Sequence, residues 1–344
     1  MSSCAELGPG GEVPRYPLLP AGWVEATPLE EPLDLGIGEV PVVDVARSDV
    51  AAAHEEAGQI LASSLAAVAV AASTEAKAPS ESEARTLKSK ANIRQATVGD
   101  VEQLVDLDHR MFGKAYGAEM PDVDTVRNML TRRIENLKGG NGWMFVCEVN
   151  GRVQGFVSAF KTSKPWDKFV SWEDSTNGGT LDGKADPQGK YVYVANMTIA
   201  PEASKHHARE RLLANLFAEG FKDGVEYGYF ESRMPGFKRW LTKEGVDPAA
   251  LSPEQLTGYA EYYANDKVMR NGKEVTRDFQ LRMYEGIAER GQGVLPNAFH
   301  DDESLNYGVI FKASLPRLPK PARYAAAWAL KAAARSPKLA SKLF

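Results

Sequence analysis

The sequence predicts an α/β domain with a mixed sheet over about residues 92–315, and three observations support this prediction. A stretch at 191–220 begins with period-two apolar residues, breaks at Pro201 and continues as a helix that can end at Gly220. Two apolar runs flank Asn150–Gly151, the dipeptide typical of a tight β-hairpin turn. Predicted strands and helices also alternate along the whole region, as they do in α/β domains.

The first elements of this domain are a strand and two helices. A short strand is expected at 93–96, and Thr97 with Asp100 matches a capping box that opens a helix. A second helix is expected at about 124–137, and Gly139–Gly140 can end it. After the hairpin and the 191–220 stretch, we expect a strand, a short helix, an inserted region, a further helix and two closing strands, at 227–231, 237–242, 247–277, 276–288, 294–295 and 307–311.

The two ends of the chain differ from this domain. Residues 1–91 form an N-terminal extension that is expected to contain an Ala-rich helix and a linker, and its apolar part at 57–73 is too rich in Ala and Ser to favour a transmembrane helix. Residues 316–344 carry seven Lys and Arg and no acidic residue, which predicts a basic amphipathic helix. This helix either packs on its own domain or binds an anionic membrane surface or an acidic partner.

Composition limits the class of protein. The chain has 344 residues, 25% of them charged, with a formal net charge of −5, which argues against binding to nucleic acid. Its two cysteines, Cys4 and Cys147, and the lack of a secretory signal favour a reducing, cytoplasmic location. With five histidines and two cysteines we expect no structural zinc site and no other metal.

The loop between strand and helix in the 191–220 stretch is a candidate anion site. A helix N-terminus offers unpaired backbone N–H groups and the positive end of the helix dipole. Five cationic or titratable side chains lie in the same segment, which suits a pyrophosphate or another polyanion: Lys205, His206, His207, Arg209 and Arg211. The alternative is an ordinary connection with a solvated basic surface.

Several segments resemble the GNAT superfamily of N-acetyltransferases. IRQATVGDVEQLVDLD is similar to the first strand and helix of that fold, WMFVCEVNGRVQGFVSAF to its second and third strands, and 191–220 to its acyl-CoA-binding strand, loop and helix. SRMPGF, FQLR and VLPNAFHDDESLNYGVIF resemble the GNAT domains that occur with carbon-nitrogen hydrolases. The resemblance covers about 93–312 and implies a mixed, mostly antiparallel sheet flanked by helices, with acyl transfer from acetyl-CoA or another acyl-CoA to an amine.

One motif departs from the family pattern. The GNAT pyrophosphate loop usually reads Gln/Arg-x-x-Gly-x-Gly/Ala, whereas this chain has ASKHHA at 203–208, with His206 at the first glycine position and Ala208 at the last. Glycine is needed where a side chain would block backbone contact or where φ is positive. Three alternatives follow: a site rebuilt from Lys205, His206 and Arg209, a different acyl carrier, or loss of catalysis.

Acyl transfer to an amine needs a base, an oxyanion donor and an acid. The resemblance implies Glu231 as the base, Asn196 as a group that orients water or substrate, and Tyr284 as the acid. It implies the N–H of Ile199 or Ala200 as the oxyanion donor. The alternatives are a solvated carboxylate, a satisfied amide and a half-buried aromatic.

The resemblance also implies binding residues. Those expected to hold the cofactor are Thr198, Ile199, Ala200, Lys205, His206, His207, Ala208 and Arg209. Asp302 and Ser304, beside Asp301, either cap a turn or hold the substrate amine.

The sequence therefore favours an N-acyltransferase that moves an acetyl or longer acyl group from a CoA-type thioester to a primary amine of a small molecule, by direct transfer in a ternary complex. A donor held on an acidic acyl carrier protein would fit the basic tail. The alternative from another class is a non-catalytic binding or scaffold protein of GNAT fold. In that case side chains could fill the space between Asn196 and Glu231.

Overall fold

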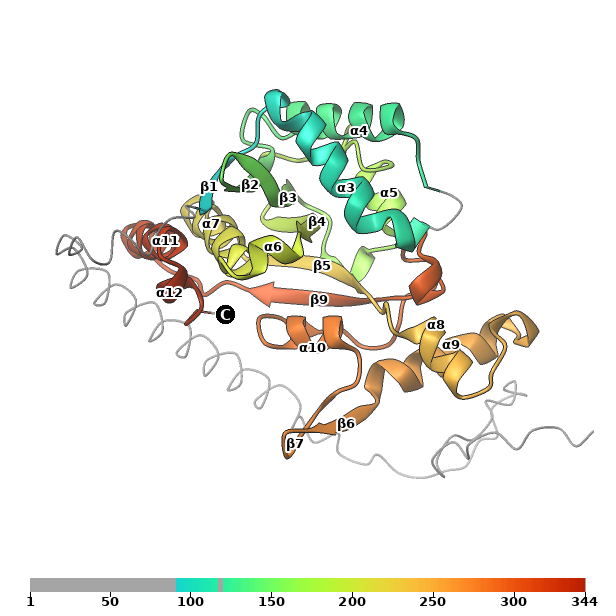
Figure 1. Cartoon of the computed structure of the whole chain (residues 1–344). Coiled ribbons are helices and arrows are strands. Elements are labelled where there is room, and N and C mark those ends of the chain that lie inside the picture. The colour runs from blue at the N-terminus through green and yellow to red at the C-terminus, as the bar shows by residue number, and fades with distance from the viewer. Residues whose placement is uncertain (1–90, 117–119, 344) are drawn as a thin grey trace, which may run out of the picture. The chain divides into compact units, whose positions relative to one another are not determined.

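A computed structural model describes residues 91–116 and 120–343 of the chain (Figure 1). In chain order the elements are β1 Ala91–Gln95, η1 Val98–Asp100, α3 Val101–Tyr116, α4 Val123–Asn136, β2 Gly142–Val149, β3 Arg152–Thr162, η3 Trp166–Lys168, α5 Trp172–Thr176, β4 Tyr191–Ile199, α6 Pro201–Ser204, α7 Ala208–Asp223, β5 Tyr227–Arg233, α8 Phe237–Lys243, η4 Pro248–Ala250, α9 Pro253–Asn265, β6 Lys267–Arg270, β7 Lys273–Thr276, α10 Phe279–Glu285, β8 Glu289–Arg290, η5 Asp302–Ser304, β9 Gly308–Ser314, α11 Lys320–Arg335 and α12 Pro337–Ala340.

Seven strands form one sheet in the order β1-β2-β3-β4-β5-β9-β8. The pair β4–β5 is parallel, and the pairs on either side of it are antiparallel. Helices flank the sheet (Figure 1). The α/β class and the mixed, mostly antiparallel sheet expected from the sequence are therefore confirmed.

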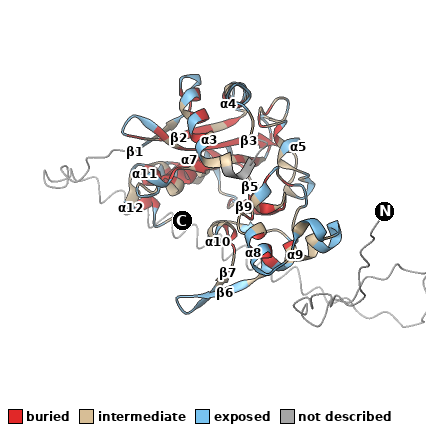
Figure 2. Ribbon diagram, turned by 45° about the vertical axis from the view of Figure 1, so that its right-hand side comes forward, coloured by how far each residue is buried: buried red, intermediate tan, exposed pale blue. Residues whose placement is uncertain are grey.

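The buried residues form clusters on the faces of the sheet. One cluster combines strand residues with α7 and α11, and includes Val157, Leu212, Phe221 and Leu330. A second combines strand residues with α3 and α4, and includes Leu104, Leu130, Phe156 and Tyr193. Figure 2 shows the burial in the central strands and in α7, whereas β6 and β7 are largely exposed.

Local sequence signals account for the first elements. The capping box of Thr97 and Asp100 is present, and Asp100 also accepts two hydrogen bonds from Arg94 at 2.7 and 2.8 Å. These bonds, with Arg94 as the main cause, lower the pKa of Asp100 to about 2. Asn150 and Gly151 both have positive φ, 52° and 78°, as the predicted hairpin turn requires.

The later elements differ in part from the prediction. The helix expected at 276–288 is shorter, because Thr276 ends β7 and the Asp278 side chain caps α10 by accepting from two backbone N–H groups. The strand expected at 294–295 is only a single bridge between Leu295 and Gly308, and β8 takes the edge of the sheet instead. The Asn271–Gly272 turn belongs to a two-stranded sheet, β6 and β7.

The basic C-terminal segment packs on its own domain. Ala326, Ala327, Leu330 and Ala334 of α11 join the cluster formed with α7, and Lys331 donates a 2.5 Å hydrogen bond to Glu219 of α7. On the same helix Tyr324 and Trp328 are 48% and 61% exposed. Of the two sequence alternatives, packing on the domain is the one that the structure shows.

The other predictions for the ends of the chain concern the N-terminal extension. The Ala-rich helix and the linker lie outside the described residues, so the extension at 1–91 and the domain limits stay predictions. Across 91–116 and 120–343, no helix is long and apolar enough to cross a membrane.

A gap between β4 and β5 sets the position of the site. The two strands pair only from Tyr191 to Tyr193, opposite Tyr227 to Tyr229, although β4 continues to Ile199 and β5 to Arg233. Beyond this pairing β4 contains a bulge beside Ala195, and β5 stays paired with β9 on its other side. The two central strands therefore diverge, and their facing edges lack strand partners.

Candidate active site

A cavity of about 1830 Å³ occupies the gap between the diverging strands. Residues of α7 and α10, such as Phe217 and Met283, line one part of it, and residues of α3 and α4, such as Phe112 and Met129, line another. Asn196 of β4 and Glu231 of β5 both line it. The structure thus brings the predicted base and the predicted orienting amide into one cavity.

The backbone of β4 directs polar groups into this gap. The Ala200 N–H donates to the Gln154 carbonyl at 2.8 Å, so Ala200 and Gln154 form a hydrogen-bonded pair of the antiparallel ladder. Because such pairs alternate, the N–H groups of Met197 and Ile199 point away from β3, toward the gap. Of the two predicted oxyanion donors, Ala200 is already bonded, and Ile199 remains.

Glu231 has the environment of a tuned base. Its Oε1 accepts a short hydrogen bond from the Tyr193 hydroxyl, and its Oε2 is buried with no partner among the described residues. Burial raises the pKa of Glu231 to about 8, although the Tyr193 hydrogen bond acts in the opposite direction. A carboxyl group with this pKa can accept a proton near neutral pH, as a general base must.

Tyr284 of α10 lines the same cavity and is buried, 8% exposed. Its ring packs on Phe230 and Phe311, with centroid distances of 4.7 and 5.7 Å. Burial raises the pKa of Tyr284 to about 12, so the hydroxyl keeps its proton at neutral pH. Its role as the acid stays a prediction, and its position is compatible with that role.

Asn196 and Thr198 are bonded to each other. The Thr198 hydroxyl donates to Asn196 Oδ1 at 2.8 Å, and Thr198 is 3% exposed. This bond orients the Asn196 amide group, because it holds the amide oxygen next to the Thr198 hydroxyl.

The predicted anion loop forms a helix N-terminus in which one residue adopts a left-handed conformation. His207 precedes α7 with φ 52°, and within the described chain no acceptor is bonded to the N–H groups of Ala208, Arg209 and Glu210. The sequence placed the glycine requirement at His206, whereas the positive φ lies at His207. The loop therefore keeps the unpaired amides that an anion site needs, without glycine.

The side chains around this helix start differ in role. Arg211 is buried and turned away, and its guanidinium donates to the carbonyls of Ala334 at 2.6 Å and Ala91 at 2.9 Å. Its inclusion in the basic loop was therefore wrong. Arg209 lines the cavity but is paired with Glu210 at 2.6 Å. Lys205 is exposed and His206 is half-buried.

Substitution of His207 tests whether the backbone N–H groups at the start of α7 or the His207 imidazole bind the phosphates of CoA. We expect His207→Gly to raise the free energy of unfolding by up to about 1 kcal/mol, because glycine adopts positive φ without steric cost. It should also keep CoA affinity if the backbone amides hold the phosphates. His207→Val should lose stability and affinity together, because a β-branched residue is strained at this φ. Thermal unfolding and calorimetric titration with CoA measure both effects. Loss of CoA binding in His207→Gly alone would mean that the imidazole is the ligand.

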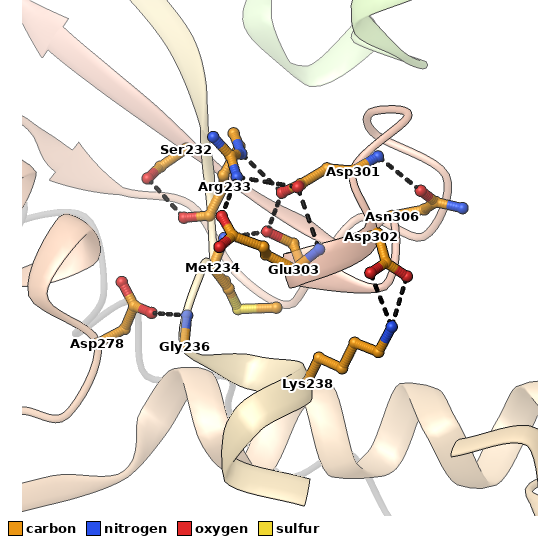
Figure 3. A network of polar contacts seen from close by, with 11 residues as sticks. Ser232, Arg233, Met234, Gly236, Lys238, Asp278, Asp301, Asp302, Glu303 and Asn306 are labelled. Carbon is orange, nitrogen blue, oxygen red and sulfur yellow. Dashed lines mark hydrogen bonds and ion pairs between the residues drawn. The ribbon is translucent and has the colours of Figure 1, made fainter. Parts of the chain in front are cut away.

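The segment that contains Asp302 and Ser304 forms a polar network beside the cavity (Figure 3). Arg233 donates to both oxygens of Asp301, at 2.6 and 2.9 Å, and Lys238 donates to Asp302 at 2.6 Å. Ser304 is fully buried, where its hydroxyl donates to Asp301 and accepts from the Met234 N–H at 2.9 Å. Ser304 thus secures the turn, as one sequence alternative stated, while Asp302 lines the cavity.

Sequence reasoning missed three residues of the site. Tyr193 holds Glu231, and Trp172 donates from its indole nitrogen to the Ala195 carbonyl of the bulge at 2.7 Å. Asp108 of α3 also lines the cavity. Asp108 interrupts the apolar face of the helix predicted after Thr97. This interruption was the one feature of the sequence that could have pointed to any of the three residues. No group of three or more His, Cys, Asp or Glu suited to a metal occurs in the described part of the chain.

Comparisons with known proteins agree with the resemblance. No protein-family model matches the chain. The chain is 22% identical over 221 residues to the uncharacterized N-acetyltransferase YkwB of Bacillus subtilis (strain 168), a match that covers 64% of this chain and 87% of that protein. This similarity is distant, and it points to N-acetyltransferases without naming a substrate.

Solved structures with a similar fold include GNAT-like enzymes. The GphF GNAT-like decarboxylase in complex with isobutyryl-CoA matches at 21% identity and a TM-score of 0.48, covering 65% of this chain and all of that one. The loading GNATL domain of CurA from Lyngbya majuscula matches at 17% identity and a TM-score of 0.47, covering 65% of this chain and 98% of that one. These comparisons give no support to an association with carbon-nitrogen hydrolases, which stays a prediction.

Proposed function

We propose that this protein is an N-acyltransferase that moves an acyl group from a CoA thioester to the primary amine of a small molecule. The observation that carries the proposal is the placement of Glu231, which lines the cavity together with residues of β4 and whose buried Oε2 has no partner among the described residues. The similarity to YkwB and the GNAT-like motifs support the same reaction class.

The binding roles follow from the free backbone groups. The thioester arm would lie along the open edge of β4, where the amides of Met197 and Ile199 point into the gap. The pyrophosphate would meet the unpaired amides at the start of α7, with Lys205, His206 and Arg209 beside them. The Ile199 N–H would donate to the thioester carbonyl oxygen and stabilise the negative charge that develops there.

The chemical steps use two side chains that line the cavity, Glu231 and Tyr284. Glu231 takes a proton from the substrate ammonium, directly or through water. The neutral amine attacks the thioester carbonyl, a C–N bond forms, and the C–S bond breaks. The Tyr284 hydroxyl gives its proton to the leaving thiolate. The second proton of the acylated nitrogen passes through solvent to the Tyr284 oxygen, so that the amide is neutral and the tyrosine is restored.

The state of the cavity favours this proposal over the scaffold alternative. A scaffold protein could fill the space between Asn196 and Glu231 with side chains, whereas both residues line an open cavity whose total volume is about 1830 Å³. A carboxyl oxygen that is buried without a partner, as Glu231 Oε2 is among the described residues, is also costly, so its presence suggests a function.

Calorimetric titration with CoA and acetyl-CoA tests the proposal. We expect micromolar binding, weakened in a variant that reverses charge at the helix start, Arg209→Glu. The matched control is Arg335→Glu, which changes a basic residue near the end of α11. No binding at millimolar CoA would contradict the use of CoA and leave carrier-bound donors or a scaffold role.

The basic tail stays a candidate surface for an acyl carrier protein or an anionic membrane, and a cytoplasmic location also stays a prediction. Removal of residues 317–344 would not test the surface, because α11 forms part of the core with α7. Substitution of the exposed Tyr324 and Trp328 leaves the core intact and is the better test.

A further inference from the structure

A second carboxylate that is buried also lines the cavity, and it belongs to α3. Asp108 of α3 is 4% exposed. Across the described residues it makes no hydrogen bond and no ion pair within 4.0 Å. An unpaired carboxylate in a buried position is costly, so a missing partner is the simplest explanation for its placement.

Two neighbouring groups that can carry positive charge, Arg133 and His109, form no hydrogen bond or ion pair with Asp108 in the described part of the chain. Arg133 and His109 are close enough to lower the pKa of Asp108, but burial has the larger effect and raises it. The Arg133 guanidinium donates to the Gly179 carbonyl at 2.6 Å and to the Ser158 hydroxyl at 3.4 Å. The Asp108 oxygens therefore remain available to a group in the cavity.

The cavity as a whole is acidic. Its lining includes three cationic side chains, Arg209, Arg233 and Lys238, and each of them is already paired with a carboxylate. The carboxylates that line it outnumber them, and they are Asp108, Glu173, Glu210, Glu231, Asp247, Asp301 and Asp302. Glu210 lies at the proposed phosphate site and is paired with Arg209. The other six carboxylates lie outside the start of α7, and their excess favours a cationic ligand in that part of the cavity.

The wall beside Asp108 is apolar. Met111 and Phe112 follow it on α3, and Val126 and Met129 of α4 also line the cavity. Such a wall suits a chain of methylene groups that ends in a charged group.

We infer that the acceptor is a diamine, with the reacting amine at Glu231 and a second ammonium group bound to Asp108. This inference rests on the proposed function and names its substrate class. The second ammonium would form the ion pair that Asp108 lacks, and the methylene chain would contact the apolar wall.

Steady-state kinetics with a series of α,ω-diaminoalkanes and the monoamines of equal length tests the inference. At the best chain length we expect kcat/KM for the diamine to exceed that for the monoamine by about tenfold or more, the effect of one buried ion pair. Asp108→Asn should reduce this ratio to near one. Asp106→Asn, on the same helix but with a 64% exposed side chain, should keep the wild-type ratio.

The thermal stability of Asp108→Asn and the amine preference of the wild type give two further checks of the inference. Asp108→Asn should fold with unchanged or higher thermal stability, because it removes an unpaired buried charge. Equal kcat/KM for diamines and monoamines in the wild type, or a preference that survives Asp108→Asn, would overturn the inference.

Direct calorimetric titration with 1,4-diaminobutane and its longer homologues separates this inference from the proposed function. If no amine is acylated, the proposed function fails, but diamine binding that is lost in Asp108→Asn would still support the site. If amines are acylated and no diamine binds better than its monoamine, the site is overturned and the function stands.

Discussion

Glu231→Gln is expected to lower kcat/KM for amine acylation by about a hundredfold or more, the usual contribution of a general base. The amide has nearly the same shape as the carboxyl group but cannot accept the proton of the substrate ammonium. CoA binding should stay within about twofold of the wild type, because the predicted cofactor groups lie on β4 and α7. Initial rates and calorimetric titration on the same preparation measure both quantities.

The same variant should change the pH profile. The base must be ionised to accept a proton, and burial raises the pKa of Glu231 to about 8. The wild-type rate should therefore increase as the pH rises through about 8, and this limb should be absent in Glu231→Gln. An exposed carboxylate on α4, Glu135, gives the matched control Glu135→Gln, which should keep the limb.

The free energy of unfolding of the wild type should fall as the pH rises, whereas its catalytic rate should rise. The folded-state pKa of Glu231 lies above its unfolded value, so the folded protein holds the proton more tightly and loses stability as the pH rises from about 4.5 to about 8. Glu231→Gln removes this loss, so its melting temperature at pH above about 8 should exceed that of the wild type. A variant with full activity, or with an unchanged pH limb, would exclude Glu231 as the base.

Arg211→Ala is expected to destabilise the fold by about 3 kcal/mol, because it leaves two carbonyl groups without their charged donor and opens space in the core. The Arg211 guanidinium joins α7 to α11 through Ala334 and to β1 through Ala91. For a domain of this size the melting temperature should fall by about 6–12 °C. Thermal unfolding at fixed pH measures the change.

Arg209→Ala is the matched control, since this neighbouring arginine is 30% exposed and forms its ion pair with the adjacent Glu210. It should change the free energy of unfolding by at most about 0.5 kcal/mol. It should weaken CoA binding about tenfold, the loss of one charged contact. Equal stability losses in the two variants, or CoA binding lost only in Arg211→Ala, would contradict the separation of their roles.

Local signals predicted most of the fold. The capping box at Thr97 and the Asn150–Gly151 turn depend on neighbours in sequence, so they could be recognised directly. The helix expected at 276–288 was too long, because its start depends on Asp278 and its end on the edge strand β8, which pairs with a distant part of the chain.

The site was harder to predict than the fold. Glu231 and Asn196 were named from a family pattern, and the gap that unites them depends on where β4 and β5 stop pairing. Arg211 was placed with the phosphate loop because its charge is visible in the sequence, whereas its burial beneath α11 is not. Tyr193 acts through Glu231, which is far away in sequence, so no local pattern identifies it. For Asp108 the only local signal was its place on the apolar face of a predicted helix, and the cavity that it lines was not visible in the sequence.

The most direct test of acyl transfer is a balance of products. The wild-type protein is incubated with acetyl-CoA and an amine panel, while free thiol is measured by colorimetry and amide product by mass spectrometry. The proposal predicts equal amounts of released CoA thiol and N-acetylated amine, both abolished together in Glu231→Gln. Thiol release without amide product, or neither product together with no CoA binding, would contradict it.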